Sequence, residues 1–116
     1  MTVEQICEIA RNLPRSREAF VRGRIKFRIG AIVYLSIAPD GSKMGCGWPK
    51  TWREAAVEAE PEKFSLPSEH DMRYHWVHVD LTVIDEDEMR ELVEDAWAFT
   101  MPKRVADEYA EEHGYR

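Results

Sequence analysis

Residues 21–41 read VRGRIKFRIGAIVYLSIAPDG, and this stretch decides the fold. Over residues 21–29, cations alternate with apolar side chains, which is the period of a strand with one apolar face. Gly30 is a turn residue. Residues 31–38 are then apolar apart from a single serine, which suits a central strand covered on both faces. The stretch therefore predicts two neighbouring strands joined by a tight turn.

A second turn follows directly. Asp40-Gly41 within PDGS accepts positive φ at low cost, so a third strand over residues 43–48 is expected to pair back on the second. Within this third strand, Gly45 and Gly47 indicate a bulge or a close approach of other groups to the backbone.

Helical patterns flank these strands. Thr2 and Gln5 form a T-x-x-Q capping box, and the apolar spacing that follows runs to Leu13 before Pro14 stops the helix. A second capping box, TWRE at residues 51–54, predicts a helix that ends before Pro61.

The C-terminal half predicts one more strand and two more helices. Residues 61–73 are expected to form a long loop, and the β-rich residues 74–84 a fourth strand. DEDE at 85–88 caps a helix with an apolar stripe, and Pro102 opens a last helix that Gly114 ends. The stripe comprises Met89, Leu92, Val93, Ala96 and Trp97. The order α-β-β-β-α-β-α-α predicts an α+β fold: an antiparallel sheet of about four strands with helices packed on it.

Composition bounds the class of protein. The 116 residues are expected to form a single domain, 1–116. No apolar run is long enough for a membrane helix, and residues 1–14 do not have the pattern of a signal peptide. Cys7 and Cys46 lie far apart without CxxC spacing, so reduced thiols in a cytoplasmic protein are expected.

Charge is unevenly distributed along the chain. The formal net charge is −6, yet residues 11–28 carry seven cations and one carboxylate. This segment has a local balance of +6, which leaves −12 for the remainder. Such asymmetry points to a cationic surface on an otherwise acidic domain.

Four stretches resemble the MmcQ/YjbR family of small bacterial proteins. They are the LP that closes the first helix, KFRIGAIVYLSIAPDG, HWVHVDL, and DEDEMRELVEDAWAFTMPKRV, which together span most of residues 1–105. The resemblance implies a compact α+β fold and a DNA-binding role, because members of that family are commonly labelled DNA-binding proteins. The chain departs from the family's pattern at KMGCGWPKTW, residues 43–52.

The cationic alternation is the strongest functional signal from the residues themselves. Alternate side chains of a strand project on one face at intervals of about 6–7 Å, so four cations are expected to follow phosphates: Arg22, Arg24, Lys26 and Arg28. This predicts weak, largely sequence-independent binding of nucleic acid or another polyanion. The alternatives are cations that protect a sheet edge from aggregation, or cations that acidic helices neutralise.

A different class of function uses aromatic residues. A small-molecule- or protein-binding module is predicted through four candidate residues: Trp48, Trp52, Trp76 and His78. His78 and Asp80 share a strand face, but no nucleophile motif accompanies them, so no enzyme activity is expected. His75 and His78 point to opposite faces of a strand, so no metal site is expected, nor any cofactor.

Overall fold

The protein, represented by a computed structural model that describes residues 2–112, is built on one antiparallel sheet of six strands in the order β1-β2-β3-β4-β6-β5. The strands are β1 (Arg17–Val21), β2 (Arg24–Ile29), β3 (Ile32–Ile37), β4 (Lys43–Gly47), β5 (Phe64–Ser65) and β6 (Trp76–Asp80). The predicted α+β class with an antiparallel sheet is confirmed. The sheet has six strands instead of about four, because β1 and the two-residue β5 were not expected.

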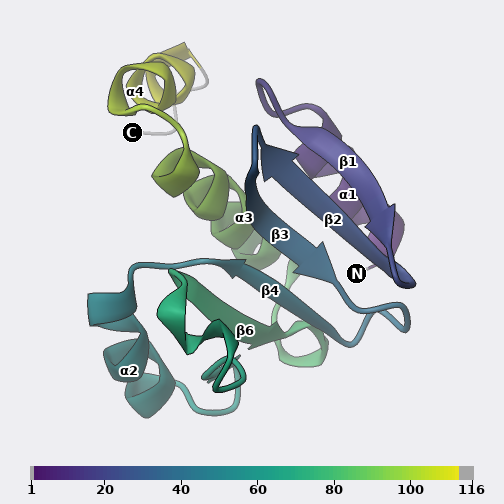
Figure 1. The fold of residues 1–116 in the computed structure, drawn as a ribbon, viewed down its shortest axis with the longest axis vertical. Coiled ribbons are helices and arrows are strands. Elements are labelled where there is room, and N and C mark those ends of the chain that lie inside the picture. The colour runs from purple at the N-terminus through teal and green to yellow at the C-terminus, as the bar shows by residue number, and fades with distance from the viewer. Residues whose placement is uncertain (1, 113–116) are drawn as a thin grey trace.

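Helices cover only one face of the sheet. The four helices are α1 (Val3–Arg11), α2 (Lys50–Ala59), α3 (Glu86–Thr100) and α4 (Lys103–Glu112). Figure 1 shows α1 and α3 behind the sheet, with α2 beside β6 and α4 beyond the end of α3. Within residues 2–112, the face turned toward the viewer, formed by β2, β3, β4 and β6, carries no α-helix and is called the open face below.

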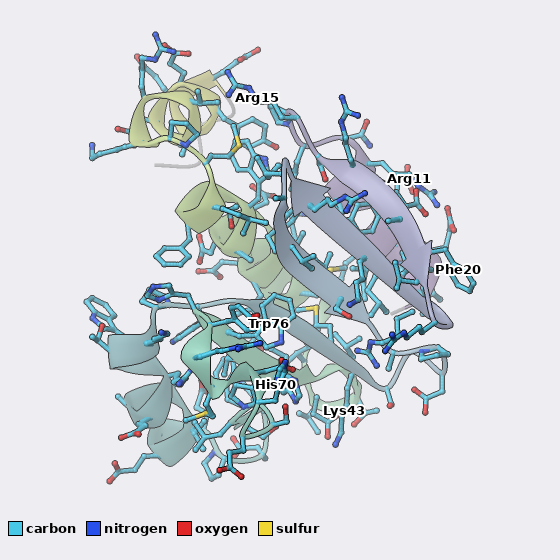
Figure 2. The ribbon with its side chains drawn as sticks, viewed as in Figure 1. Arg11, Arg15, Phe20, Lys43, His70 and Trp76 are labelled. Atoms are coloured by element: carbon cyan, nitrogen blue, oxygen red, sulfur yellow. The ribbon has the colours of Figure 1, made fainter. Side chains whose placement is uncertain are left out.

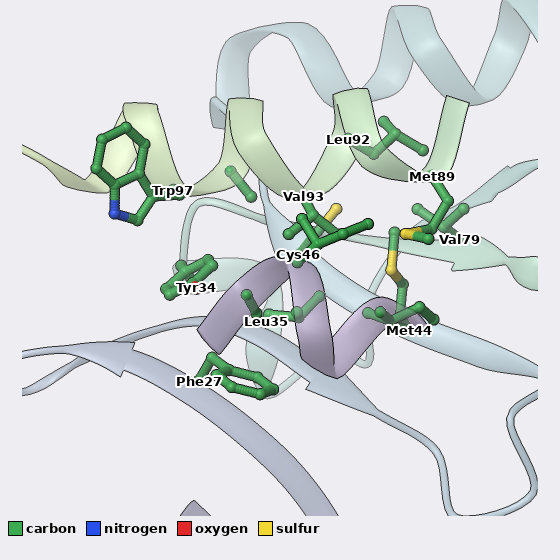
Figure 3. Packing of buried hydrophobic residues seen from close by; sticks show 14 of the residues in the cluster. Phe27, Tyr34, Leu35, Met44, Cys46, Val79, Met89, Leu92, Val93 and Trp97 are labelled. Atoms are coloured by element: carbon green, nitrogen blue, oxygen red, sulfur yellow. The ribbon is translucent and has the colours of Figure 1, made fainter. Parts of the chain in front are cut away.

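The core lies between the sheet and α3. The predicted stripe of α3 is buried throughout and belongs to one hydrophobic cluster with Phe27, Leu35 and Met44 of the strands (Figure 3). Trp97 at the end of the stripe donates a hydrogen bond from Nε1 to the carbonyl of Pro14 at 2.9 Å. This bond ties α3 to the turn that follows α1.

Two of the three predicted helix caps are confirmed. Thr2 caps α1, with its Oγ1 accepting from the Gln5 N–H at 3.2 Å and its own N–H donating to Gln5 Oε1 at 2.6 Å. Asp85 caps α3 by accepting from the Glu88 N–H at 2.8 Å. Carboxylates in the first turn also favour the positive end of the helix dipole.

The capping box predicted for α2 is wrong. The helix begins at Lys50, ahead of Thr51, and its N-cap, Pro49, makes no side-chain cap. The N–H of Lys50 donates instead to Nδ1 of His75 at 3.0 Å. A side chain distant in sequence therefore satisfies the helix N-terminus, which no local pattern can reveal.

The basic stretch is not one continuous strand. Val21 pairs with Arg24 across a two-residue hairpin turn, and both turn residues have positive φ: 52° at Arg22 and 80° at Gly23. These angles are those of a type I′ turn, whose twist matches that of the flanking strands. Arg22 therefore lies in the turn, off the strand face to which it was assigned.

A β-bulge in β3 breaks the alternation beside it. Phe27 pairs with Leu35 and Arg28 pairs with Val33, so Tyr34 is the extra residue. Tyr34 is fully buried near Trp97, its hydroxyl is 2.5 Å from Ser16 Oγ, and burial raises its pKa to about 12. The bulge therefore adds an aromatic ring to the core without breaking the sheet.

Residues 61–84 contain more elements of regular secondary structure than the sequence predicted. The loop contains β5 and a 3-10 turn at Asp71–Arg73, and the fourth predicted strand is shorter, ending at Asp80 before a second 3-10 turn, Leu81–Val83. Gly114, the predicted end of the last helix, lies outside the described residues. Over residues 2–112, no helix has the length and apolar character needed to span a membrane.

Candidate binding face

A cavity of about 1060 Å³ lies over the open face. Its floor is formed by β2, β3, β4 and β6, and one wall by residues 68–75. Phe99 and Thr100, at the end of α3, close a further side. The cavity therefore brings together residues from four of the six strands, the segment before β6 and the end of α3.

The floor follows directly from the strand register. Lys26 pairs with Ser36, Ser36 with Gly45, and Gly45 with His78, so these residues form one row across four strands. Directly paired residues share a face of the sheet. With about 4.8 Å between neighbouring strands, Lys26 and His78 stand about 14 Å apart across the row.

Cations line the side of the cavity nearest β1. Arg24, Lys26 and Arg28 alternate along β2 on the open face, as predicted, and the first two line the cavity. Arg17 of β1 pairs directly with Arg28, so it joins them on this face. These four residues (Arg17, Arg24, Lys26 and Arg28) are called the cationic ridge below. Arg17 thus takes the place that the sequence assigned to Arg22.

The ridge is not neutralised by ion pairs. Within residues 2–112, none of its four side chains forms a salt bridge. Arg24 donates from Nε to Ser36 Oγ at 2.9 Å, which holds its guanidinium along the floor. Asp40 is near enough for Arg24 to contribute to the lowering of its carboxyl pKa, but its hydrogen bonds to Ser42 lower it more. Both alternatives for these cations therefore lose support: apart from Arg17 they do not lie on the outer edge strand, and within residues 2–112 no helix forms ion pairs with them.

Trp76 leans across the floor of the cavity. A Cβ atom at Gly45 would meet Nε1, Cζ2 and Cε2 of this indole at 2.5–2.6 Å. The expected close approach at Gly45 is therefore real, and the group that approaches is the ring of Trp76. Figure 2 places Trp76 and His70 over the part of the sheet where β4 and β6 run side by side.

His78 lies on the same floor, in surroundings that favour the neutral form of its imidazole. Burial, followed by the charges of Arg24 and Lys43, lowers the pKa of its imidazole, while Asp71 acts in the opposite direction. Asp80, the other polar residue on this face of β6, accepts from the N–H of Thr82 at 2.9 Å and from Thr82 Oγ1 at 2.6 Å. Asp80 therefore caps the following turn and is not oriented as a partner of His78.

A buried arginine fixes the wall of the cavity. Arg53 of α2 is 6% exposed, and it donates to the carbonyls of Met72 at 2.5 Å, Tyr74 at 2.8 Å and Trp76 at 3.4 Å. All three acceptors belong to the segment that leads into β6. Arg53 thereby positions the backbone from which Tyr74 and Trp76 project.

The predicted tryptophan set is divided by the fold. Trp76 and His78 lie on the cavity floor with the cations. Trp48 packs its ring on Phe64 with the centroids 5.4 Å apart, and its buried Nε1 has no hydrogen-bond partner among the described residues. Trp52 is 69% exposed on α2 and does not line the cavity.

The cavity also contains residues that were not candidates from the sequence. His70 and His75 line it beside the predicted His78. Arg73 lines it too, with its guanidinium carbon 4.9 Å from the centre of the Tyr74 ring. Asp71 is the one carboxylate among its lining residues. His70, Asp71 and Arg73 belong to residues 61–73, which the sequence predicted as a loop, so only the fold could assign them to the site.

The described residues offer little for metal or thiol chemistry. In the range 2–112, no three His, Cys, Asp or Glu side chains come together in the manner of a metal site. Cys7 and Cys46 are both buried and free. Burial raises the pKa of the Cys46 thiol to about 12, which keeps it protonated at neutral pH.

Comparisons with known proteins agree with this architecture. The fold is similar to that in the crystal structure of Deinococcus radiodurans protein DR2400, which carries the family-model domain DUF419. The TM-score is 0.74 at 18% identity, over 99% of this chain and 89% of that one. The sequence model of the YjbR family matches residues 11–99, and the chain belongs to that family. No curated protein matches the chain.

Proposed function

We propose that this YjbR-family protein binds nucleic acid through the open face of its sheet, with the cationic ridge contacting phosphates. The observation that carries the proposal is that Arg24, Lys26 and Arg28 project from one strand without ion-pair partners, beside an open cavity. Cations spaced by two residues along β2 lie about 6–7 Å apart, which suits repeated contacts with a charged backbone.

The acidic net charge does not oppose such binding. The molecule measures 34 × 30 × 28 Å, whereas exposed charges are screened beyond about 8 Å at physiological salt. Acidic groups concentrate on helices, for example Glu86, Asp87 and Glu88 in the first turn of α3, which packs on the other face of the sheet. The electrostatic interaction of a phosphate at the ridge is therefore determined mainly by the local cations.

We propose binding and not catalysis. Asp80, the carboxylate on the same strand face as His78, is engaged by Thr82, and within residues 2–112 no carboxylate forms a hydrogen bond or ion pair with His78. The buried Cys46 thiol has a raised pKa and lies on the core side of β4. Neither group has the partners that an activated nucleophile or a general base needs.

The proposal is tested by charge reversal on the ridge. Fluorescence anisotropy with a labelled oligonucleotide would compare the wild type with the double variant Lys26→Glu/Arg28→Glu. If four cations meet phosphates of a single strand, log K should fall with log salt at a slope of about −2.8. The variant should lose at least tenfold in affinity at low salt, with a shallower slope.

A matched control has the same change in net charge elsewhere. Lys103→Glu/Arg104→Glu reverses two exposed cations on α4, away from the cavity. It should bind within about twofold of the wild type. Equal losses in both double variants would mean that overall charge, not the ridge, governs binding. No binding by the wild type at low salt would overturn the proposal.

A further inference from the structure

We infer that the open face selects single-stranded nucleic acid, with an unpaired base placed against Trp76 and Tyr74 while the phosphates follow the cationic ridge. This inference rests on the proposed function and specifies its ligand. The ridge contributes Arg24 and Lys26 to the cavity lining, whereas aromatic and apolar side chains line other parts of it.

Exposed aromatic and apolar side chains surround the cavity. Ile32, Tyr74 and Phe99 are 60%, 51% and 45% exposed, and all three line it. Large apolar groups gathered at one cavity of a small domain indicate a ligand with an apolar surface. A phosphate backbone alone would leave this part of the cavity without a partner.

The position of Trp76 is fixed before any ligand binds. Gly45 leaves the room above β4 that its indole occupies, and Arg53 fixes the Trp76 carbonyl and the preceding backbone. The ring is thus positioned by both a neighbouring strand and α2. A ring ordered before binding loses little conformational freedom when a base stacks on it.

The charges at the cavity fit an anionic strand. Arg24, Lys26 and Arg73 line it against the single carboxylate of Asp71. Its volume of about 1060 Å³ is at the upper limit for drug-sized ligands, about 300–1,000 Å³. An extended chain of several units fits these dimensions better than one compact molecule.

The combination distinguishes single strands from duplexes. In a duplex the faces of the bases stack on each other, so a protein meets phosphates and base edges only. In a single strand each base offers a π-face to an aromatic side chain while cations track the backbone. The cavity supplies both partners, with the ridge on β2 and the aromatic groups on β6 and its preceding segment.

The experiment compares a labelled twelve-nucleotide oligo(dT) with its duplex with oligo(dA), at equal salt. We expect the single strand to bind at least tenfold more tightly to the wild type. Trp76→Leu should weaken the single strand about tenfold, since stacking of one base contributes on that scale. It should leave duplex binding within twofold.

Two further variants keep the result interpretable. Trp52→Leu removes a more exposed tryptophan outside the cavity and should change neither affinity. Tyr74→Ala, at a half-exposed site, tests the same surface if Trp76→Leu fails to fold. Equal affinity for duplex and single strand, with no effect of either cavity variant, would overturn this inference. If both probes still bound through the ridge, the proposed function would stand. If the wild type bound neither probe, the proposed function and this inference would both be overturned.

Discussion

The indole of Trp76 occupies the position in which the side chain of residue 45 would lie. Gly45 is on β4 and Trp76 on the adjacent β6, and a Cβ at position 45 would approach three ring atoms to 2.5–2.6 Å. Since real Cβ atoms do not make such contacts, the ring must move if the glycine is replaced. The pair therefore links the composition of β4 to the shape of the cavity floor.

We predict that Gly45→Ala displaces Trp76 and lowers the free energy of unfolding by about 1–3 kcal/mol, as overpacking does. Urea unfolding and the tryptophan emission spectrum would measure both effects. Gly47→Ala is the control, because its Cβ would meet no atom nearer than the Ala96 carbonyl oxygen at 3.4 Å. Similar spectra for Gly45→Ala and the wild type would contradict the predicted displacement.

We predict that Arg53→Met lowers the free energy of unfolding by about 2–3 kcal/mol, because buried carbonyls of the cavity wall lose their charged donor. Hydrogen exchange should become faster at Tyr74 and Trp76. Lys50→Met makes the same exchange of a cation for methionine on the same helix at an exposed position and should change stability little. Loss of stability without faster exchange in this segment would argue against a positioning role.

His78 should make stability depend on pH. Its pKa in the folded protein is lowered, chiefly by burial and then by Arg24 and Lys43, with Asp71 opposing. Below the ordinary value of 6.5 the unfolded chain therefore binds more protons at this site than the folded one. Stability should be full at pH 7.5 and fall as the pH drops below 6.5. His78→Gln should show a smaller loss between pH 7.5 and 5.5 in urea midpoints, and an unchanged loss would contradict the assignment.

The hairpin turn gives a pair of changes with opposite signs. Gly23→Ala places a Cβ on a residue with φ of 80° and should cost about 1–2 kcal/mol. Arg22→Asn should stabilise, because asparagine accepts the left-handed conformation that Arg22 holds at φ of 52°. Thermal unfolding would measure both. A loss of stability in Arg22→Asn would show that the arginine side chain has a role beyond the turn.

Much of the fold could be predicted because its signals are local. The Thr2–Gln5 capping box and the Asp85 cap each involve residues three positions apart, and the α3 stripe repeats at the helical period. Local signals failed where contacts between residues distant in sequence determine the structure. His75, twenty-five residues away, caps α2, and the bulge at Tyr34 becomes apparent only once β2 and β3 are paired.

The candidate site was only half predictable. Alternation along β2 identified Arg24, Lys26 and Arg28, but strand alternation cannot show that a cross-strand partner such as Arg17 joins them. Nor does it show that the aromatic candidate Trp76 shares their cavity, since the two lie on β2 and β6. The sequence presented nucleic-acid binding and aromatic recognition as rival functions. The strand order β2-β3-β4-β6 places Arg24, Lys26, Trp76 and His78 around one cavity.

The cationic ridge and the carboxylates in the first turn of α3 lie on opposite faces of the sheet, so we expect the surface charge of the molecule to be strongly uneven. Its binding to charged chromatography media should therefore depend on which face meets the medium more than on the net charge of −6. At neutral pH and low ionic strength, one and the same preparation can adhere to an anion exchanger by its helical side and to heparin by its sheet. Two such molecules can also attract each other, sheet against helices, at concentrations where a uniformly acidic protein would repel its copies.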